Sequence, residues 1–154
     1  MTAKRIHQSI AIAAAGGLLA AAGFIPAASA GGGARCFGEE VTITATGPVI
    51  NGTPGRDVID AGPGADGING RGGGDLICAG SGKDAVKGGG GGDRVSGDSG
   101  ADLILGGSGG DKLFGRGGAD RFDGDQGRDL CKGGGGRDLA RAATCERVKG
   151  AKEV

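Results

Sequence analysis

The feature that most constrains the fold of this chain is an aspartate that recurs every nine residues without a slip. The ten aspartates are Asp57, Asp66, Asp75, Asp84, Asp93, Asp102, Asp111, Asp120, Asp129 and Asp138. A glycine lies two residues before each of them, from Gly55 to Gly136. A short fixed period of this kind is the sequence signature of a solenoid, in which each repeat buries its apolar side chain against neighbouring repeats.

The eighth position of each repeat is apolar when the repeat is numbered from five residues before its aspartate. This position holds Ile59, Ile68, Ile77, Val86, Val95, Ile104, Leu113, Phe122, Cys131 and Ala140. We expect three residues around it to form a very short strand whose middle side chain points inward. The six residues before the strand are expected to form a turn, so the pattern predicts an all-β fold.

Glycine content limits how such a chain is stabilised. The 154 residues include 40 glycines and four phenylalanines, but neither Trp nor Tyr. A chain of this composition builds only a small core and needs metal ions or disulfides as additional links. Glycine-rich turns allow backbone carbonyls to converge, and carbonyl with carboxylate oxygens suit calcium better than zinc or copper. Stacked aspartates also repel one another without a cation, so the metal is predicted to be part of the fold.

Two units show a family resemblance most clearly, Gly88–Ser96 and Gly106–Phe114. They resemble the RTX (haemolysin-type) calcium-binding nonapeptide G-G-x-G-x-D-x-U-x, and ten consecutive units in register extend this resemblance over residues 52–141. The resemblance implies a parallel β-roll, a right-handed β-solenoid of about five coils with two nonapeptides in each coil. Calcium would lie between the turns of repeats i and i+2.

The resemblance also implies two columns of calcium ligands. One edge would carry Asp57, Asp75, Asp93, Asp111 and Asp129, and the other Asp66, Asp84, Asp102, Asp120 and Asp138. Five coils leave four gaps on each edge, hence at most eight enclosed Ca²⁺ ions. Backbone carbonyls would complete the coordination, for example those of Gly88, Gly89, Gly91, Gly106, Gly107 and Gly109.

Two positions of the repeat depart from the family pattern. The fifth, commonly Asn in the family, is a cation at Arg56, Lys83, Arg128 and Arg137. The second is not glycine in half of the units, where it is Thr53, Arg71, Asp98, Arg116 or Asp125. Nearby cations weaken a calcium site through their field, although salt screens exposed charges. We therefore expect the turns around Asp93 and Asp111 to bind calcium best and the terminal turns to bind it least.

Three segments flank the repeats. Residues 1–30 have the pattern of a secretory signal, with Lys4 and Arg5 before an apolar run and Ala28-Ser29-Ala30 as cleavage site. The alternative is a membrane-anchoring helix, for which the run is rather short. Residues 31–51 are predicted to be an N-terminal cap with one strand over Val41–Thr46, and residues 142–154 a C-terminal cap.

Removal of residues 1–30 narrows the possible functions. It takes away the only histidine, His7, and leaves 16 basic residues (18 minus Lys4 and Arg5) against 18 acidic ones. The mature chain then has no imidazole for base catalysis or for a zinc site. Its interleaved charges form no basic patch for nucleic acid. We expect a secreted, extracellular protein that binds no nucleic acid and, after signal removal, no membrane.

Four cysteines in a secreted chain allow two disulfides in three possible pairings. We predict Cys36 with Cys78 and Cys131 with Cys145. Cys78 occupies the outward ninth position of its repeat, where the N-terminal segment can fold back on it. Cys131 occupies an inward eighth position near the last coil. Each bridge would then attach one cap to the stack.

These patterns predict a secreted calcium-binding β-roll that folds on binding calcium, has a structural or interaction role and is not an enzyme. One alternative is an extracellular adhesion module that uses a flat sheet face. Another is a hydrolase that uses carboxylates such as Asp98, Asp123 and Asp125, although nothing predicts a pocket around them. A third is a disordered glycine-rich tail, the state expected without calcium. Calcium is the only partner predicted, and the sequence names no protein or cell-wall partner.

Overall fold

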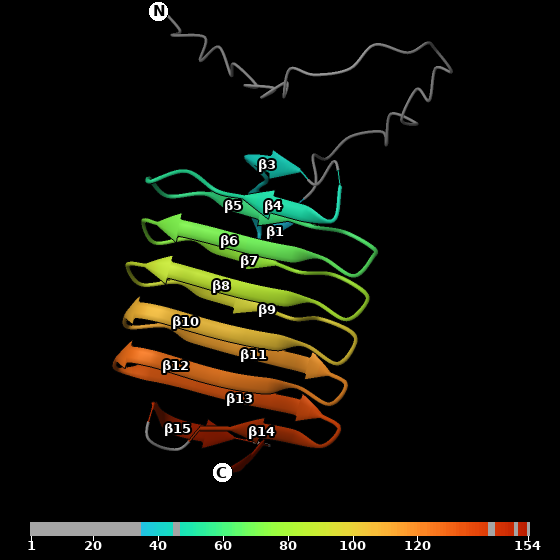
Figure 1. Ribbon diagram of the computed structural model, residues 1–154, viewed down its shortest axis with the longest axis vertical. Coiled ribbons are helices and arrows are strands. Elements are labelled where there is room, and N and C mark those ends of the chain that lie inside the picture. The colour runs from blue at the N-terminus through green and yellow to red at the C-terminus, as the bar shows by residue number, and fades with distance from the viewer. Residues whose placement is uncertain (1–34, 45–46, 142–143, 150, 154) are drawn as a thin grey trace, which may run out of the picture. The chain divides into compact units, whose positions relative to one another are not determined.

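The repeats form two parallel β-sheets that face each other (Figure 1). The computed structural model describes residues 35–44, 47–141, 144–149 and 151–153, which contain strands and turns but no helix. The strands are β1 (Arg35–Cys36), β2 (Glu39–Glu40), β3 (Ile43–Thr44), β4 (Val49–Asn51), β5 (Val58–Asp60), β6 (Gly67–Gly72), β7 (Leu76–Cys78), β8 (Ala85–Gly90), β9 (Arg94–Ser96), β10 (Leu103–Gly109), β11 (Lys112–Gly117), β12 (Arg121–Gly127), β13 (Asp129–Gly135), β14 (Asp138–Ala140), β15 (Cys145–Lys149) and β16 (Ala151–Glu153).

The chain alternates between the two sheets from one repeat to the next. One sheet has the order β16-β14-β12-β10-β8-β6-β4 and the other β15-β13-β11-β9-β7-β5-β3. Neighbouring strands within each sheet are parallel, with Ile59 paired to Ile77 in one and Ile104 to Phe122 in the other. Both pairs are two repeats apart, so two nonapeptides make one coil. The all-β parallel β-solenoid of about five repeat coils is confirmed.

The core is the column of eighth-position side chains between the sheets. All ten are at most 4% exposed, from Ile59 to Ala140, and those of both sheets belong to one apolar cluster. Ile50 of β4 extends this cluster at the N-terminal end. Because each coil contributes only two such side chains, the apolar contacts connect mainly neighbouring coils.

The strands are longer than the sequence predicts. Several of them, such as β6, β8, β10 and β12, run on from the eighth position into the glycines that open the next repeat. Leu105 pairs with Asp123 and, two residues on, Gly107 with Asp125, so the ladder continues through residues that were expected to be turn. The expectation of three-residue strands holds only for elements such as β5, β7, β9 and β14.

The N-terminal cap contains more strands than the one that was predicted. Within Val41–Thr46 the structure has the short strand β3, while residues 45–46 lie outside the described part of the chain. In addition, β1 and β2 form an antiparallel pair, and β4 joins the sheet that does not contain β3. Each sheet thus receives one cap strand at its N-terminal end.

The C-terminal cap continues the stack in the same manner. Strand β15 pairs in parallel with β13, with a register shift at Asp129 and Leu130, and β16 pairs in parallel with β14. The two caps therefore add one rung to each end of both sheets.

Two disulfides attach the caps to the repeats, with the predicted pairings. Cys36 of β1 is bonded to Cys78 of β7, and Cys131 of β13 to Cys145 of β15. The β1–β2 pair also contacts the outer face of the sheet, because the Phe37 ring lies 6.1 Å from that of Phe114 and the Arg94 guanidinium lies 4.2 Å over Phe37.

The predicted secretory signal, residues 1–30, lies outside the described residues. Over the part of the chain that is described, no helix is long and apolar enough to cross a membrane.

Candidate metal sites

The aspartates form two ladders, one on each edge of the roll. All ten are between 0 and 7% exposed. The backbone N–H of one aspartate donates to Oδ1 of the aspartate two repeats later, for example Asp75 to Asp93 and Asp93 to Asp111, both at 2.8 Å. The same bond joins the pairs Asp57–Asp75, Asp66–Asp84, Asp84–Asp102, Asp102–Asp120, Asp111–Asp129 and Asp120–Asp138. The structure thus brings the aspartates together in the two predicted columns.

The second carboxylate oxygen of the ladder aspartates, Oδ2, is the atom that would bind a cation. In eight aspartates Oδ2 is buried and has no hydrogen-bond partner among the described residues: Asp66, Asp75, Asp84, Asp93, Asp102, Asp111, Asp120 and Asp138. A buried acceptor without a partner costs about 1–3 kcal/mol, and more when it is charged. A repeated array of such oxygens indicates a site for positive charge on both edges.

Backbone carbonyls converge on the same oxygens. A Cβ placed on Gly106, at the first position of its repeat, would lie 2.5 Å from Oδ2 of Asp111 and 2.7 Å from the carbonyl oxygen of Gly124 in the next coil. A Cβ placed on Gly88 would likewise lie close to Oδ2 of Asp93 and to the carbonyl oxygen of Gly106. Carboxylate and carbonyl oxygens that share one small space are the hard ligands that calcium prefers, so these residues fit a calcium ion.

The other predicted carbonyl residues lie in the same turns. Gly89, Gly91, Gly107 and Gly109 all have positive φ, between 110° and 136°. A Cβ on any of them would collide with a backbone carbonyl of the preceding coil, that of Gly73 in the case of Gly91. The carbonyls therefore stack in columns beside the aspartates, which is the arrangement that a row of ions between turns requires.

Within the repeat turns, four residues adopt this strained backbone without being glycine. Arg71, Asp98, Arg116 and Asp125 occupy the second position with φ between 63° and 79°. A non-glycine residue in the left-handed region costs about 1–2 kcal/mol. At these four second positions coil stacking therefore imposes the turn conformation on a residue that has a Cβ.

Burial is the main cause of the raised pKa values of the ladder aspartates. It raises the pKa of Asp93 and of Asp102 to about 6, where the neighbouring aspartates of the column add repulsion and the backbone N–H bond opposes the rise. The pKa values of Asp75, Asp84, Asp111 and Asp120 are also raised, again first by burial. Protons and cations therefore compete for the same oxygens.

No cluster of three or more His, Cys, Asp or Glu side chains occurs in the described residues. The ladder aspartates are joined to one another one coil apart, for example Asp75 to Asp93, so a site here would have few carboxylates and would rely on carbonyls. This composition separates the candidate sites from zinc sites built of side chains alone.

Thr144, which completes the last coil, is not predicted by any pattern in the sequence. Its Oγ1 accepts a hydrogen bond from Gly124 N–H at 3.0 Å and donates one to Oδ1 of Asp123 at 2.9 Å. Its carbonyl lies beside Gly124, where the preceding coils have the carbonyl of a repeat glycine. Thr144 follows Gly124 by 20 residues rather than 18, so the nine-residue period does not reveal it.

The three carboxylates considered for hydrolysis are separate from the ladders and engaged in other contacts. Asp98 accepts a hydrogen bond from Ser96 Oγ at 2.7 Å and lies 3.9 Å from Arg116. Asp123 pairs with Arg141 at 2.7 Å. Asp125 lines a shallow surface groove with Lys87 and Ser108.

A parallel β-roll with buried aspartate ladders and convergent carbonyls defines a class of repeat proteins that bind calcium between turns. The family model of the RTX calcium-binding nonapeptide repeat (4 copies) matches residues 49–77, 79–113 and 105–140. These segments make up more than half of the chain, so the protein belongs to the RTX calcium-binding nonapeptide-repeat family. No curated protein and no solved structure matches it.

Proposed function

We propose that this protein is a secreted structural module whose β-roll folds when calcium binds between its turns. The observation that carries the proposal is the row of buried Oδ2 oxygens that have no partner among the described residues, several of which, such as those of Asp93 and Asp111, lie close to carbonyls of the next coil. Without a cation these oxygens oppose folding by their desolvation and mutual repulsion. With calcium they become ligands, so binding and folding are coupled.

The proposed ligands are the aspartate carboxylates of the two ladders together with first- to fourth-position carbonyls such as those of Gly88, Gly89, Gly91, Gly106, Gly107 and Gly109. The four gaps between repeat turns on each edge set an upper limit of eight enclosed ions. The ions would neutralise a column of negative charge and join each coil to the next. The turns around Asp93 and Asp111, which have coils on both sides, are proposed to bind most tightly.

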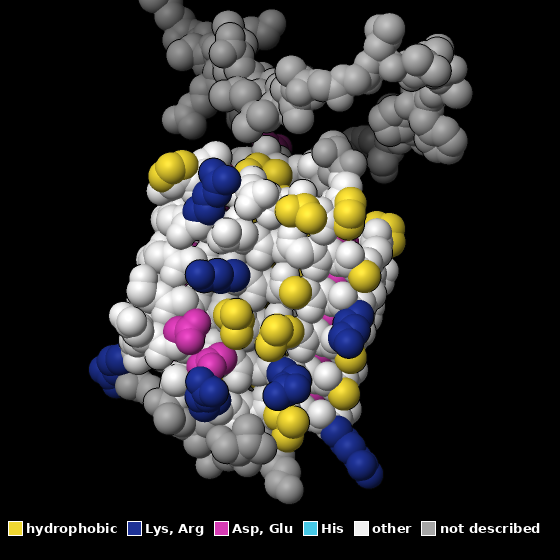
Figure 2. Space-filling view, in the orientation of Figure 1, with side chains coloured by type: hydrophobic (Ala, Val, Ile, Leu, Met, Phe, Trp, Pro, Cys, Tyr) yellow, Lys and Arg dark blue, Asp and Glu magenta, His cyan; other side chains and the backbone are white. Residues whose placement is uncertain are grey.

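Secretion is supported by the signal pattern in residues 1–30 and by two disulfides, which persist in oxidising compartments. A structural role is favoured over adhesion by the outer surface. Among the described residues, only two large hydrophobic side chains are exposed, Val49 (72%) and Leu103 (43%). Figure 2 shows basic, acidic and apolar side chains interspersed on one face, with no large apolar patch for a partner.

Circular dichroism of the mature chain, with its disulfides intact, tests the coupling. At pH 7.5 we expect a strong strand signal with millimolar calcium, its loss with excess chelator and its return when calcium is restored. Magnesium at the same concentration is the control, because it demands a smaller octahedral site and releases water reluctantly. An equal strand signal in chelator would show that the coils do not need the metal.

A further inference from the structure

The first of the ten turns has a different backbone from all the others. In the other nine repeats, the second and fourth residues both have positive φ. At the second position these are Gly62, Arg71, Gly80, Gly89, Asp98, Gly107, Arg116, Asp125 and Gly134, and at the fourth Gly64, Gly73, Gly82, Gly91, Gly100, Gly109, Gly118, Gly127 and Gly136. Thr53 and Gly55, the corresponding residues of the first repeat, do not have positive φ. The carbonyls of this turn therefore do not have the orientation that the other turns share.

Thr53 followed by Pro54 explains the difference from the sequence. Pro54 occupies the third position of the first repeat, between Thr53 and Gly55. Pro63 occupies the same position of the second repeat, but the residue before it is Gly62, which still has positive φ, so a proline alone does not prevent the common turn. A proline fixes its own φ near −65° and restricts the residue before it to extended conformations. Thr53 is β-branched, which further disfavours the left-handed region. The turn that the other repeats form is thus closed to this one.

Thr53 provides the contacts that the Asp57 carboxylate needs. Its backbone N–H donates to Oδ2 of Asp57 at 2.6 Å, and its Oγ1 lies 3.0 Å from the same oxygen and 3.2 Å from Oδ1. Gly55 N–H in turn donates to Thr53 Oγ1 at 3.2 Å. In Asp75 and Asp93, by contrast, Oδ2 is buried without a partner in the described structure. Oδ2 of Asp57 already has hydrogen-bond donors, whereas Oδ2 of the later aspartates would need a cation.

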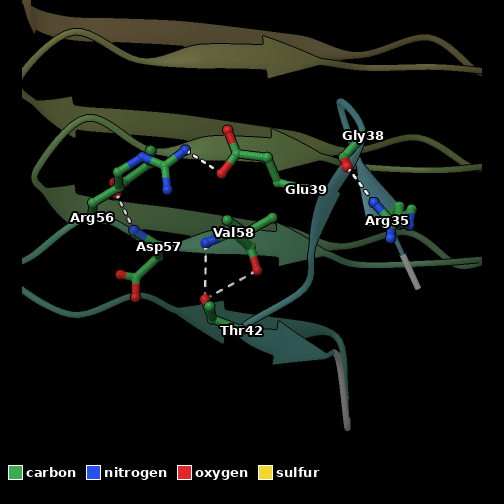
Figure 3. A network of polar contacts seen from close by, with 8 residues as sticks. Arg35, Gly38, Glu39, Thr42, Arg56, Asp57 and Val58 are labelled. Atoms are coloured by element: carbon green, nitrogen blue, oxygen red, sulfur yellow. Dashed lines mark hydrogen bonds and ion pairs between the residues drawn. The ribbon is translucent and has the colours of Figure 1, made fainter. Parts of the chain in front are cut away.

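Polar contacts with the N-terminal cap fix the rest of the first coil (Figure 3). Arg56 forms an ion pair with Glu39 at 2.6 Å, which places a guanidinium next to the Asp57 turn. Thr42 Oγ1 accepts a hydrogen bond from Val58 N–H at 2.8 Å and lies 3.2 Å from the Val58 carbonyl oxygen. None of these contacts needs a metal ion.

We propose that Thr53 and Pro54 make the first turn a metal-free cap, so that the gap between the turns of Asp57 and Asp75 takes no calcium. Thr53 N–H and Oγ1 provide the Asp57 carboxylate with the contacts that calcium provides for the later aspartates. The upper limit for ions enclosed between repeats then falls from eight to seven. The inference rests on the proposed function, since it assigns the sites of the same calcium array.

The test compares Asp57→Asn with Asp93→Asn in the full mature chain. Both changes keep the size of the side chain and one oxygen acceptor, which receives Thr53 N–H at position 57 and Asp75 N–H at position 93. Each protein is stripped of metal, dialysed to equilibrium against calcium, checked by circular dichroism and analysed for bound calcium by atomic emission. We expect Asp57→Asn to bind as many ions as the wild type. Asp93→Asn, which changes a ligand at two gaps, should bind one or two fewer.

A second variant tests the assignment to Thr53 and Pro54. Thr53→Gly combined with Pro54→Gly converts the first turn into an all-glycine run before Arg56, close to Gly88–Gly92. We expect one additional calcium ion per chain, whereas Thr53→Ser, which keeps the hydroxyl, should leave the number unchanged. A folded double variant that gains no ion would contradict the assignment.

The possible failures are distinguishable. A wild-type chain that binds no calcium would overturn the proposed function and this inference with it. Equal calcium losses in Asp57→Asn and Asp93→Asn would overturn the inference alone and leave the calcium-binding β-roll in place.

Discussion

At the scale of single residues, glycine serves two different purposes in most of the turns. After the first repeat the fourth-position glycines, such as Gly91, have positive φ, and the second position has it even where the residue is Arg or Asp. The first-position glycines, such as Gly106, have ordinary φ but no room for a Cβ beside the aspartate oxygen. Sequence reasoning attributed the glycines to dihedral freedom alone, and it missed the second purpose because crowding by the next coil is not visible in one repeat.

Gly106→Ala tests the spatial purpose. Its Cβ would lie 2.5 Å from Oδ2 of Asp111 and 2.7 Å from the Gly124 carbonyl oxygen, so these two proposed ligand atoms would have to shift. We expect the loss of one bound ion by equilibrium dialysis and a decrease of about 1–3 kcal/mol in the free energy of unfolding in calcium, the usual range for overpacking.

Gly90→Ala is the matched control for this change. Gly90 also lacks positive φ, and its nearest contact for a Cβ is Ser108 Oγ at 3.5 Å. This variant should keep the calcium content and the stability of the wild type. Similar effects of the two alanines would show that the space at Gly106 has no role in binding.

At the scale of the elements, the strands and their order follow from the repeat, but the attachment of the caps does not. The apolar eighth positions predicted which side chain of each strand is buried, from Ile59 to Ala140. Among the described residues, the β1–β2 pair forms no ladder with a strand of the repeats. It is held by Cys36–Cys78 and by the contact of Phe37 with Arg94 and Phe114. The cap is thus fixed by a few specific contacts rather than by a ladder.

The Cys36–Cys78 disulfide is therefore expected to stabilise the N-terminal end. Replacing both residues by alanine removes a crosslink between residues 42 positions apart. We expect the free energy of unfolding in calcium to fall by about 2–4 kcal/mol, the typical contribution of a disulfide. Urea denaturation followed by circular dichroism measures this change.

Hydrogen exchange locates the effect of the same double variant. Amides of residues 35–44 should exchange faster, while those near Ile104 should be unaffected at early times, because solenoid coils interact chiefly with their neighbours. An unchanged urea midpoint together with unchanged exchange would show that the cap is held without the bridge.

At the scale of the whole molecule, the ladders make stability depend on pH in opposite directions with and without calcium. Burial raises the pKa of Asp93 and Asp102 in the folded chain from 3.8 to about 6. The metal-free fold is therefore favoured when these groups are protonated. This stabilisation is complete below about pH 3.8 and is lost as the pH rises through about 6. Calcium reverses the preference, because it binds the ionised form.

We accordingly expect calcium-free protein to gain strand signal when the pH is lowered from 7.5 to 4.5 in metal-depleted buffer. The apparent calcium affinity should change in the other direction between pH 7.5 and 5.5. It should fall by about fourfold for each ligand carboxylate with a pKa near 6, from the ionised fraction alone. Calorimetry at the two pH values, with buffers of different ionisation enthalpy, measures both the affinity and the protons released. A pH-independent affinity without proton release would contradict the raised pKa values.

The periodic part of this protein can be predicted from its amino-acid sequence. The spacing of Asp57 to Asp138 and of the eighth-position side chains defined the coil, the two columns and the core, because each repeat contacts equivalent repeats and one pattern is sufficient for all. The tertiary structure alone decided what happens where the pattern ends. Thr53 satisfies Asp57, and Thr144 completes the last coil two residues out of register. The end coils lack a neighbouring repeat on one side, so contacts outside the period complete them.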